Sequence, residues 1–340
     1  MAISGNSSYI PTAQDFVAHW NSANAALGAL GPHTLPGKPL GFATDVTVGT
    51  LDGLLGQLVT KAAVIQSLVN ATDLVRADLA SLQVEALEYV VKFNGKVRGS
   101  LTGTRWVAAL PEAPTIGSAQ SNFCDPLDDA VDLWGRINVA EAMGPGKELE
   151  LVNNRVEPPV AYPVADFTAL VVLLRETWRA LGRAEMDLKL GRGSRDELQD
   201  KVHAILKAYR QVLPTFFKAD SAIGKSLPRL TPVPGSTPDP ATLSGVWNAV
   251  TAKADLSATV PEQTGLKSLR LLYSPGSSWS EGDASVVDSQ DLEEADLSQP
   301  VVFHTDYALA NAGNRALFRV VVVNETDNEA SSNVVEMVRT

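Results

Sequence analysis

Two stretches of the chain decide the fold: PTAQDFVAHWNSAN at residues 11–24 and DPLDDAVDLWGRIN at residues 125–138. Four residue types recur in them with the same order and spacing, namely Asp15, Val17, Trp20 and Asn24 in the first and Asp129, Val131, Trp134 and Asn138 in the second. Trp and Asn four residues apart share one face of a helix. We therefore expect each Trp to pack in a helical core and each Asn to hydrogen-bond the irregular backbone after its helix. A ligand-binding aromatic pair is the functional alternative.

The similarity continues beyond these stretches. Apolar positions one repeat apart correspond after an insert of unequal length, as Tyr89 does with Tyr209. This predicts a duplicated helical region, with repeat 1 at residues 11–114 and repeat 2 at residues 115–226. Repeats of this kind are typical of scaffolding proteins.

Each repeat is predicted to hold three helices. We expect the first helices to begin at Thr12, with Asp15 as its capping partner, and at Asp125, with Pro126 in its first turn. Apolar residues in four- and three-residue steps follow, and such steps favour shallow left-handed helix packing in an antiparallel bundle. The inserts at residues 33–47 and 147–163 are rich in Pro, which predicts short edge strands or extended arms.

The run Gly191-Arg192-Gly193-Ser194 predicts a turn between two helices. A phosphate-binding loop would follow a strand and end in Lys-Ser/Thr, which this run does not. Because the two repeats are in register, we expect a matching helix break near residues 70–73.

The chain changes character after the helical region. Residues 227–240 hold five Pro residues and predict a stiff linker. Apolar residues then alternate with polar ones in runs separated by turn residues, which predicts a β-sandwich over residues 241–340. With residues 1–10 as a tail, the sequence predicts a multi-domain α plus β protein. A duplicated, mainly α-helical bundle region is followed by an all-β sandwich.

The end of this region reads LFRVVVVN at residues 317–324 and SSNVV at residues 331–335. These segments resemble the final two strands of a fibronectin type III domain, within the immunoglobulin-like β-sandwiches. The resemblance is confined to residues 241–340. It implies a spacer or interaction module, because domains of this family seldom catalyse reactions.

The charge and the apolar runs of the chain exclude some classes of binding partner. The net charge is −11 and no Lys/Arg run occurs, which argues against nucleic acid or an anionic membrane as partner. The longest apolar run, at residues 169–174, is too short to span a bilayer, so we expect no membrane insertion. Residues 1–9 show no signal peptide, and the compartment stays open: cytoplasmic by default, or the cell surface by a leaderless route.

Two groups of residues are candidates for chemistry. Asp125, Asp128, Asp129 and Asp132 could hold a divalent cation, although acidic residues also collect at helix N-termini for electrostatic reasons. Cys124, the single cysteine, excludes an internal disulfide and lies beside the same helix start, where a thiolate is stabilised. The four His residues, His19, His33, His203 and His304, are scattered along the chain. We favour a structural interpretation of both groups, with no catalytic residue, metal or cofactor.

These features predict a non-enzymatic structural or adaptor protein that self-associates or docks to a larger assembly. The sandwich would be its interaction module. The alternative is a carbohydrate- or peptide-binding accessory protein that uses Tyr273, Trp279 and Tyr307 on one face of the sandwich. A metal-dependent hydrolase built on the Asp cluster ranks last.

Overall fold

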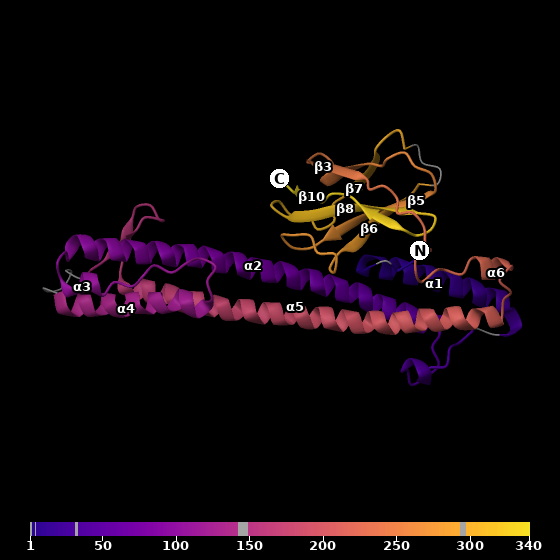
Figure 1. The fold of residues 1–340 in the computed structure, drawn as a ribbon, viewed down its shortest axis with the longest axis horizontal. Coiled ribbons are helices and arrows are strands. Elements are labelled where there is room, and N and C mark those ends of the chain that lie inside the picture. The colour runs from indigo at the N-terminus through magenta and orange to yellow at the C-terminus, as the bar shows by residue number, and fades with distance from the viewer. Residues whose placement is uncertain (1, 4, 31–32, 142–148, 293–296) are drawn as a thin grey trace. The chain divides into compact units, whose positions relative to one another are not determined.

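The computed structural model describes residues 2–3, 5–30, 33–141, 149–292 and 297–340 (Figure 1). The chain divides into two compact units. Unit 1 comprises residues 1–70 and 188–340, and unit 2 comprises residues 71–187. The order of elements confirms the predicted fold class, because a long helical region precedes an all-β region of antiparallel sheets.

The helical part of unit 1 is built around one buried core. Its helices are α1 (Asn6–Leu27), the first part of α2 (Val48–Ser100), the last part of α5 (Val164–Val212) and the short α6 (Ala222–Lys225), with 3-10 turns at Gly28–Leu30, Lys38–Leu40 and Leu213–Thr215. Phe16 and Trp20 of α1 pack there with Leu51 and Leu58 of α2 and with Tyr209 of α5. The first part of α2 and the last part of α5 run side by side.

Unit 2 has a core of the same kind. It contains the last part of α2, α3 (Arg105–Ala108), α4 (Gln120–Glu141), strands β1 (Leu151–Asn153) and β2 (Val160–Tyr162), and the first part of α5. Trp134 of α4 packs with Tyr89 and Phe93 of α2 and with Phe167 of α5. Each core therefore combines residues from both of the repeats predicted at residues 11–114 and 115–226.

The predicted helix breaks are wrong. α2 runs without interruption through residues 70–73, and α5 runs through Gly191 and Gly193. Glycine in a helix costs only about 1 kcal/mol relative to alanine, which favourable packing can outweigh. A Cβ on Gly191 would lie 3.2 Å from Leu68 Cδ1, so the missing side chain allows two helices to approach closely.

The expected starts of the first helices are also wrong, because both helices begin earlier. α1 begins at Asn6 and α4 at Gln120, and each contains a proline, Pro11 or Pro126, near its N-terminal end. Proline lacks the N–H that would bond to the carbonyl four residues earlier, and in both helices that carbonyl lies in the first turn. The apolar residues predicted in four- and three-residue steps are largely buried on α2 and α5. The last of the predicted steps, Phe216, lies beyond α5 and is half exposed.

The inserts that follow α1 and α4 contain the expected extended segments. Leu35 forms an antiparallel bridge with Val46. In the second insert, described from residue 149, β1 pairs with β2 so that Leu151 lies opposite Tyr162. The partners are 11 residues apart in both cases.

The β region of unit 1 is a sandwich of two antiparallel sheets. Its strands are β3 (Thr242–Asn248), β4 (Lys253–Thr259), β5 (Leu266–Ser274), β6 (Ser285–Asp291), β7 (Val301–Thr305), β8 (Arg315–Asn324), β9 (Glu329–Ser331) and β10 (Val335–Val338). Among the described residues, one sheet has the order β3-β4-β7 and the other β10-β8-β5-β6, with β9 also paired to β8. Alternate residues of both sheets, including Leu256, Phe303, Leu271 and Phe318, fill the core between them.

The Pro-rich segment at residues 227–240 is held along its length. Leu230 O accepts a hydrogen bond from Ile3 N at 3.0 Å, and Val233 N donates one to Thr326 O at 3.0 Å. Asn324 Nδ2 donates to Ser236 O at 2.8 Å. The segment is thus bonded both to the N-terminal residues and to the β8–β9 turn.

Candidate functional site

The repeated Trp and Asn residues make the same contacts in both units. Trp20 Nε1 donates to His33 O at 3.2 Å, and Asn24 Oδ1 accepts from His33 N at 2.9 Å. We call this arrangement, a Trp and an Asn that hold the N–H and C=O of one later residue, the Trp/Asn clamp.

The second clamp lies in unit 2. Trp134 Nε1 donates to Leu149 O at 2.5 Å, and Asn138 Oδ1 accepts from Leu149 N at 2.8 Å. Both Trp side chains are fully buried and stack on aromatic rings, Trp20 on Tyr209 at 4.6 Å and Trp134 on Phe93 at 5.3 Å between centroids. The predicted packing and hydrogen bonding are confirmed, and both Trp rings are buried in their cores.

The other repeated residues are peripheral to the clamps. Val17 and Val131 are partly buried and pack against their respective cores. Asp15 is half-buried and lines a surface cleft with His19 and Arg229, whereas Asp129 is exposed. The Trp, Asn and Val positions of the signature therefore correspond between the two units, whereas the Asp positions do not.

The four candidate acidic residues do not form a metal centre. Asp128 pairs with Arg175, and Asp132 pairs with Arg136 one helical turn later at 2.8 Å. Asp125 and Asp129 are exposed on α4. Nowhere in the described ranges do three His, Cys, Asp or Glu side chains gather as metal ligands.

Cys124 is buried in α4, and burial raises the pKa of its thiol. A thiol with a raised pKa is a poor nucleophile near neutral pH, which agrees with the structural interpretation.

The four His residues lie apart from one another in the structure. His19 Nδ1 lies 2.8 Å from Tyr209 Oη, and its Nε2 lies 2.9 Å from Ile223 O. His33 is buried beside Phe216, and burial lowers its pKa. His203 lies in α5, and His304 of β7 pairs with Asp255 at 2.7 Å on the surface of the sandwich.

The three candidate aromatic residues of the sandwich do not share an exposed face. Tyr273 is buried, and its hydroxyl accepts a hydrogen bond from Gln66 Nε2 at 3.2 Å. Trp279 is partly buried, with the Arg319 guanidinium 4.5 Å from its ring centroid. Tyr307 is exposed, but its ring packs against Tyr273 at 5.1 Å. Stacking on a sugar or peptide needs exposed ring faces, so this arrangement favours packing.

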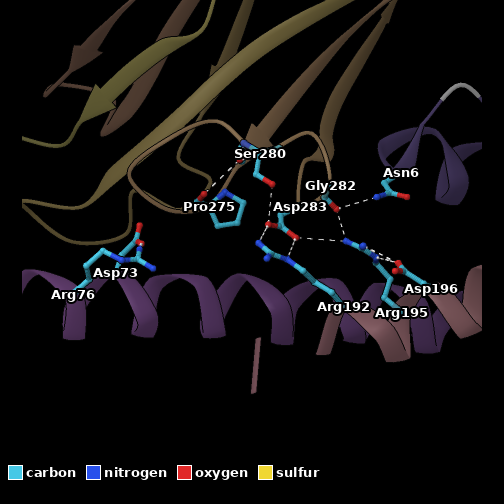
Figure 2. A network of polar contacts seen from close by, with 11 residues as sticks. Asn6, Asp73, Arg76, Arg192, Arg195, Asp196, Pro275, Ser280, Gly282 and Asp283 are labelled. Atoms are coloured by element: carbon cyan, nitrogen blue, oxygen red, sulfur yellow. Dashed lines mark hydrogen bonds and ion pairs between the residues drawn. The ribbon is translucent and has the colours of Figure 1, made fainter. Parts of the chain in front are cut away.

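A polar network that the sequence did not reveal joins the sandwich to the helices within unit 1 (Figure 2). The side chain of Asp283, in the loop before β6, is only 1% exposed. It receives two hydrogen bonds from Arg192 and one from Ser280 Oγ at 3.0 Å. The hydrogen bond to Asp283 raises the pKa of Arg192, so its guanidinium stays charged.

Neighbouring groups extend the network. Arg195 Nη1 donates to Gly282 O and lies 3.5 Å from Asp283 Oδ1. The remaining Arg195 donors bind Asp196, and Asn6 Nδ2 of α1 donates to Gly282 O at 3.3 Å. The only sequence signal here was the Gly191–Ser194 run, which we interpreted as a turn.

A cavity of about 200 Å³ lies beside this network, lined by residues of α1, α2, α5 and the loop before β6. Its walls include apolar side chains together with the side chains of Arg195 and Gln199. Within unit 1, this cavity and the network make the junction of helices and sandwich the best defined polar site.

By length and composition alone, α2 could cross a membrane. An 18-residue window of it has a mean hydropathy of 1.2, and 28% of that window is buried. Core helices of soluble proteins meet the same criteria, and α2 contributes to the buried cores of both units.

No protein-family model, no curated protein and no solved structure matches this chain.

Proposed function

We propose that this protein is a non-enzymatic structural or adaptor protein that self-associates through its helical region and presents the β-sandwich as an interaction module. It works outside the membrane and needs no cofactor. The observation that carries the proposal is a row of exposed apolar side chains on α2 in unit 2.

This row, which we call the α2 row, consists of Leu74, Ala77, Val84 and Val91. Leu74, Val84 and Val91 are 65%, 49% and 55% exposed. Ala77, Val84 and Val91 are seven residues apart, so they lie on one face of the helix, and Leu74 flanks them. Heptad spacing of apolar residues is the pattern by which one helix packs along another.

The acidic side chain between Val84 and Val91 is neutralised within unit 2. Glu88 pairs with Lys92 at 2.6 Å and with Arg155 at 2.7 Å, and these partners lower its pKa. A second copy of the chain would meet an apolar strip in which the carboxylate between Val84 and Val91 is already paired. Two-fold interfaces place the same patch of both subunits in contact, so the α2 row is suited to pair with itself.

The duplication supports a scaffolding role and is itself part of the proposal. The two Trp/Asn clamps and the two matching insert pairings are what two copies of one unit would show. The clamps hold backbone groups, and the candidate catalytic residues have no matching set. Duplication of the core without duplication of the candidate catalytic residues favours a structural role over a catalytic one.

We also propose that the sandwich is of the fibronectin type III kind and acts as a spacer or interaction module. Of the two segments that carry the sequence resemblance, LFRVVVVN lies in β8, and SSNVV runs from the end of β9 to the first residue of β10. β10 pairs antiparallel with β8, with Phe318 opposite Val335. The network around Asp283 supports such a role, because it holds the sandwich against the helices of unit 1.

Self-association is tested by multi-angle light scattering across a wide concentration range. We expect the wild-type protein to exceed its chain mass of 36.1 kDa and the double variant V84K/V91K to return to it. The control is Val246→Lys, which changes a valine of comparable exposure on β3 and leaves association intact. A wild-type protein that stays monomeric at every concentration would sink the proposal.

A further inference from the structure

The cavity at the junction of unit 1 carries an inference beyond assembly. We infer that it binds a small, uncharged molecule of single-ring size that exchanges a hydrogen bond with Gln199. The argument rests on the walls of the cavity, on its charge and on its volume.

Gln199 supplies a buried polar side chain to the cavity wall. This side chain is 8% exposed, and it makes no hydrogen bond with any residue in the described part of the chain. Its amide is therefore free to hydrogen-bond a molecule in the cavity, and one such bond contributes about 0.5–1.5 kcal/mol. The amide offers both a donor and an acceptor, which suits a hydroxyl or an amide group.

The rest of the wall combines apolar and polar side chains. Ile10 of α1, Leu58 and Ile65 of α2 and Val286 of β6 supply its apolar part, and polar residues such as Ser7 and Ser285 also line it. Small-molecule sites combine apolar side chains with polar groups that fix the orientation of the ligand. The occupant therefore has an apolar body and a polar group directed at Gln199.

The charges beside the cavity cancel. Arg195 is bonded to Asp196 and Gly282 O, and Asp283 balances Arg192. A carboxylate or phosphate would compete with Asp196 and Asp283 for guanidinium groups that are already paired. A cation would meet these arginines, so the site selects against both signs of charge.

The volume sets the size of the occupant. An engineered apolar cavity of about 150 Å³ in another protein accommodates benzene. A cavity of about 200 Å³ accordingly fits one six-membered ring with a small substituent. Gln14, at its edge, is exposed, so the cavity can be reached from solvent.

The inference is tested by ligand-observed NMR titration of the full-length protein with phenol, toluene and benzoate. We expect phenol to bind most tightly, toluene more weakly and benzoate not to bind. Gln199→Leu keeps the side chain's size but removes its amide, so phenol should lose roughly two- to tenfold in affinity, while toluene should not weaken.

A second variant tests the location. Ala62 lines the cavity, and Ala62→Leu should fill part of it and abolish binding of both phenol and toluene. Circular dichroism checks that each variant is folded. The inference is overturned by wild-type protein that does not bind phenol at millimolar concentration, or by binding that survives Ala62→Leu unchanged. Light scattering of the same samples reports self-association separately, so the two proposals fail independently.

Discussion

The two Trp/Asn clamps allow the same substitution to be tested at two matching sites. Replacing Asn24 by Ala removes the acceptor of the His33 N–H, and replacing Asn138 by Ala removes that of the Leu149 N–H. Leaving a buried donor unpaired costs about 1–3 kcal/mol. Since both Asn side chains are only half-buried and water can reach them, we expect about 1–2 kcal/mol per clamp, at the lower end of that range.

The assay is hydrogen exchange measured by mass spectrometry, which reads each unit without assuming that the whole chain unfolds in one step. In Asn24→Ala, exchange should rise about tenfold in the peptide containing His33 and stay unchanged in the peptide containing Leu149. Asn138→Ala should show the opposite.

The control keeps the acceptor. Asn24→Asp and Asn138→Asp retain an oxygen at the same position, so both should exchange at nearly the wild-type rate at neutral pH. If alanine and aspartate variants lose equal protection, or if the alanine variants lose none, the clamp hydrogen bonds do not hold the inserts in the way described.

Three further predictions follow from burial and packing. Burial lowers the folded-state pKa of His33 below its ordinary 6.5, so the unfolded chain binds the proton first and the stability of the fold should fall as the pH drops below 6.5. Urea unfolding midpoints of the wild type and of His33→Gln at pH 7.5 and 5.5 measure this loss. An equal pH dependence in both proteins would contradict the prediction. Gly193→Ala should stabilise α5 by about 0.5–1 kcal/mol because the new Cβ would meet open space. Gly191→Ala should stabilise it less, because its Cβ would lie 3.2 Å from Leu68 Cδ1. Thermal melts that show the reverse order would refute the packing argument. Cys124 should react with a thiol reagent far more slowly in the native protein than in urea, and equal rates would show that the thiol is accessible.

Much of the local structure followed from sequence patterns. Period-two alternation around Leu256, Leu271 and Val320 predicted strands, and these side chains fill the sandwich core. The spacing of Trp and Asn predicted which side chain packs and which one bonds to the backbone. These features depend on residues close in the chain, where helix and strand geometry fix which side chains share a face.

Other features depend on contacts between distant residues. The continuity of α5 through Gly191 was not predictable, because the local cost of glycine is outweighed by packing against Leu68. The contacts between the two predicted repeats, with Trp20 on Tyr209 and Trp134 on Phe93, required knowing how the long helices pair.

The candidate functional site depends entirely on contacts between residues that are distant in the sequence. Arg192 and Asp283 are 91 residues apart, and nothing in either local sequence marks them as partners. Gln199 belongs to a helix whose pattern predicts only an apolar seam, and its missing partner is visible only once α1, α2 and the sandwich enclose it. The sequence by itself determined the elements and their buried faces, because periodicity acts over a few residues. The tertiary structure alone decided the junction and its cavity, because burial and charge pairing there arise from segments that meet only in the folded chain.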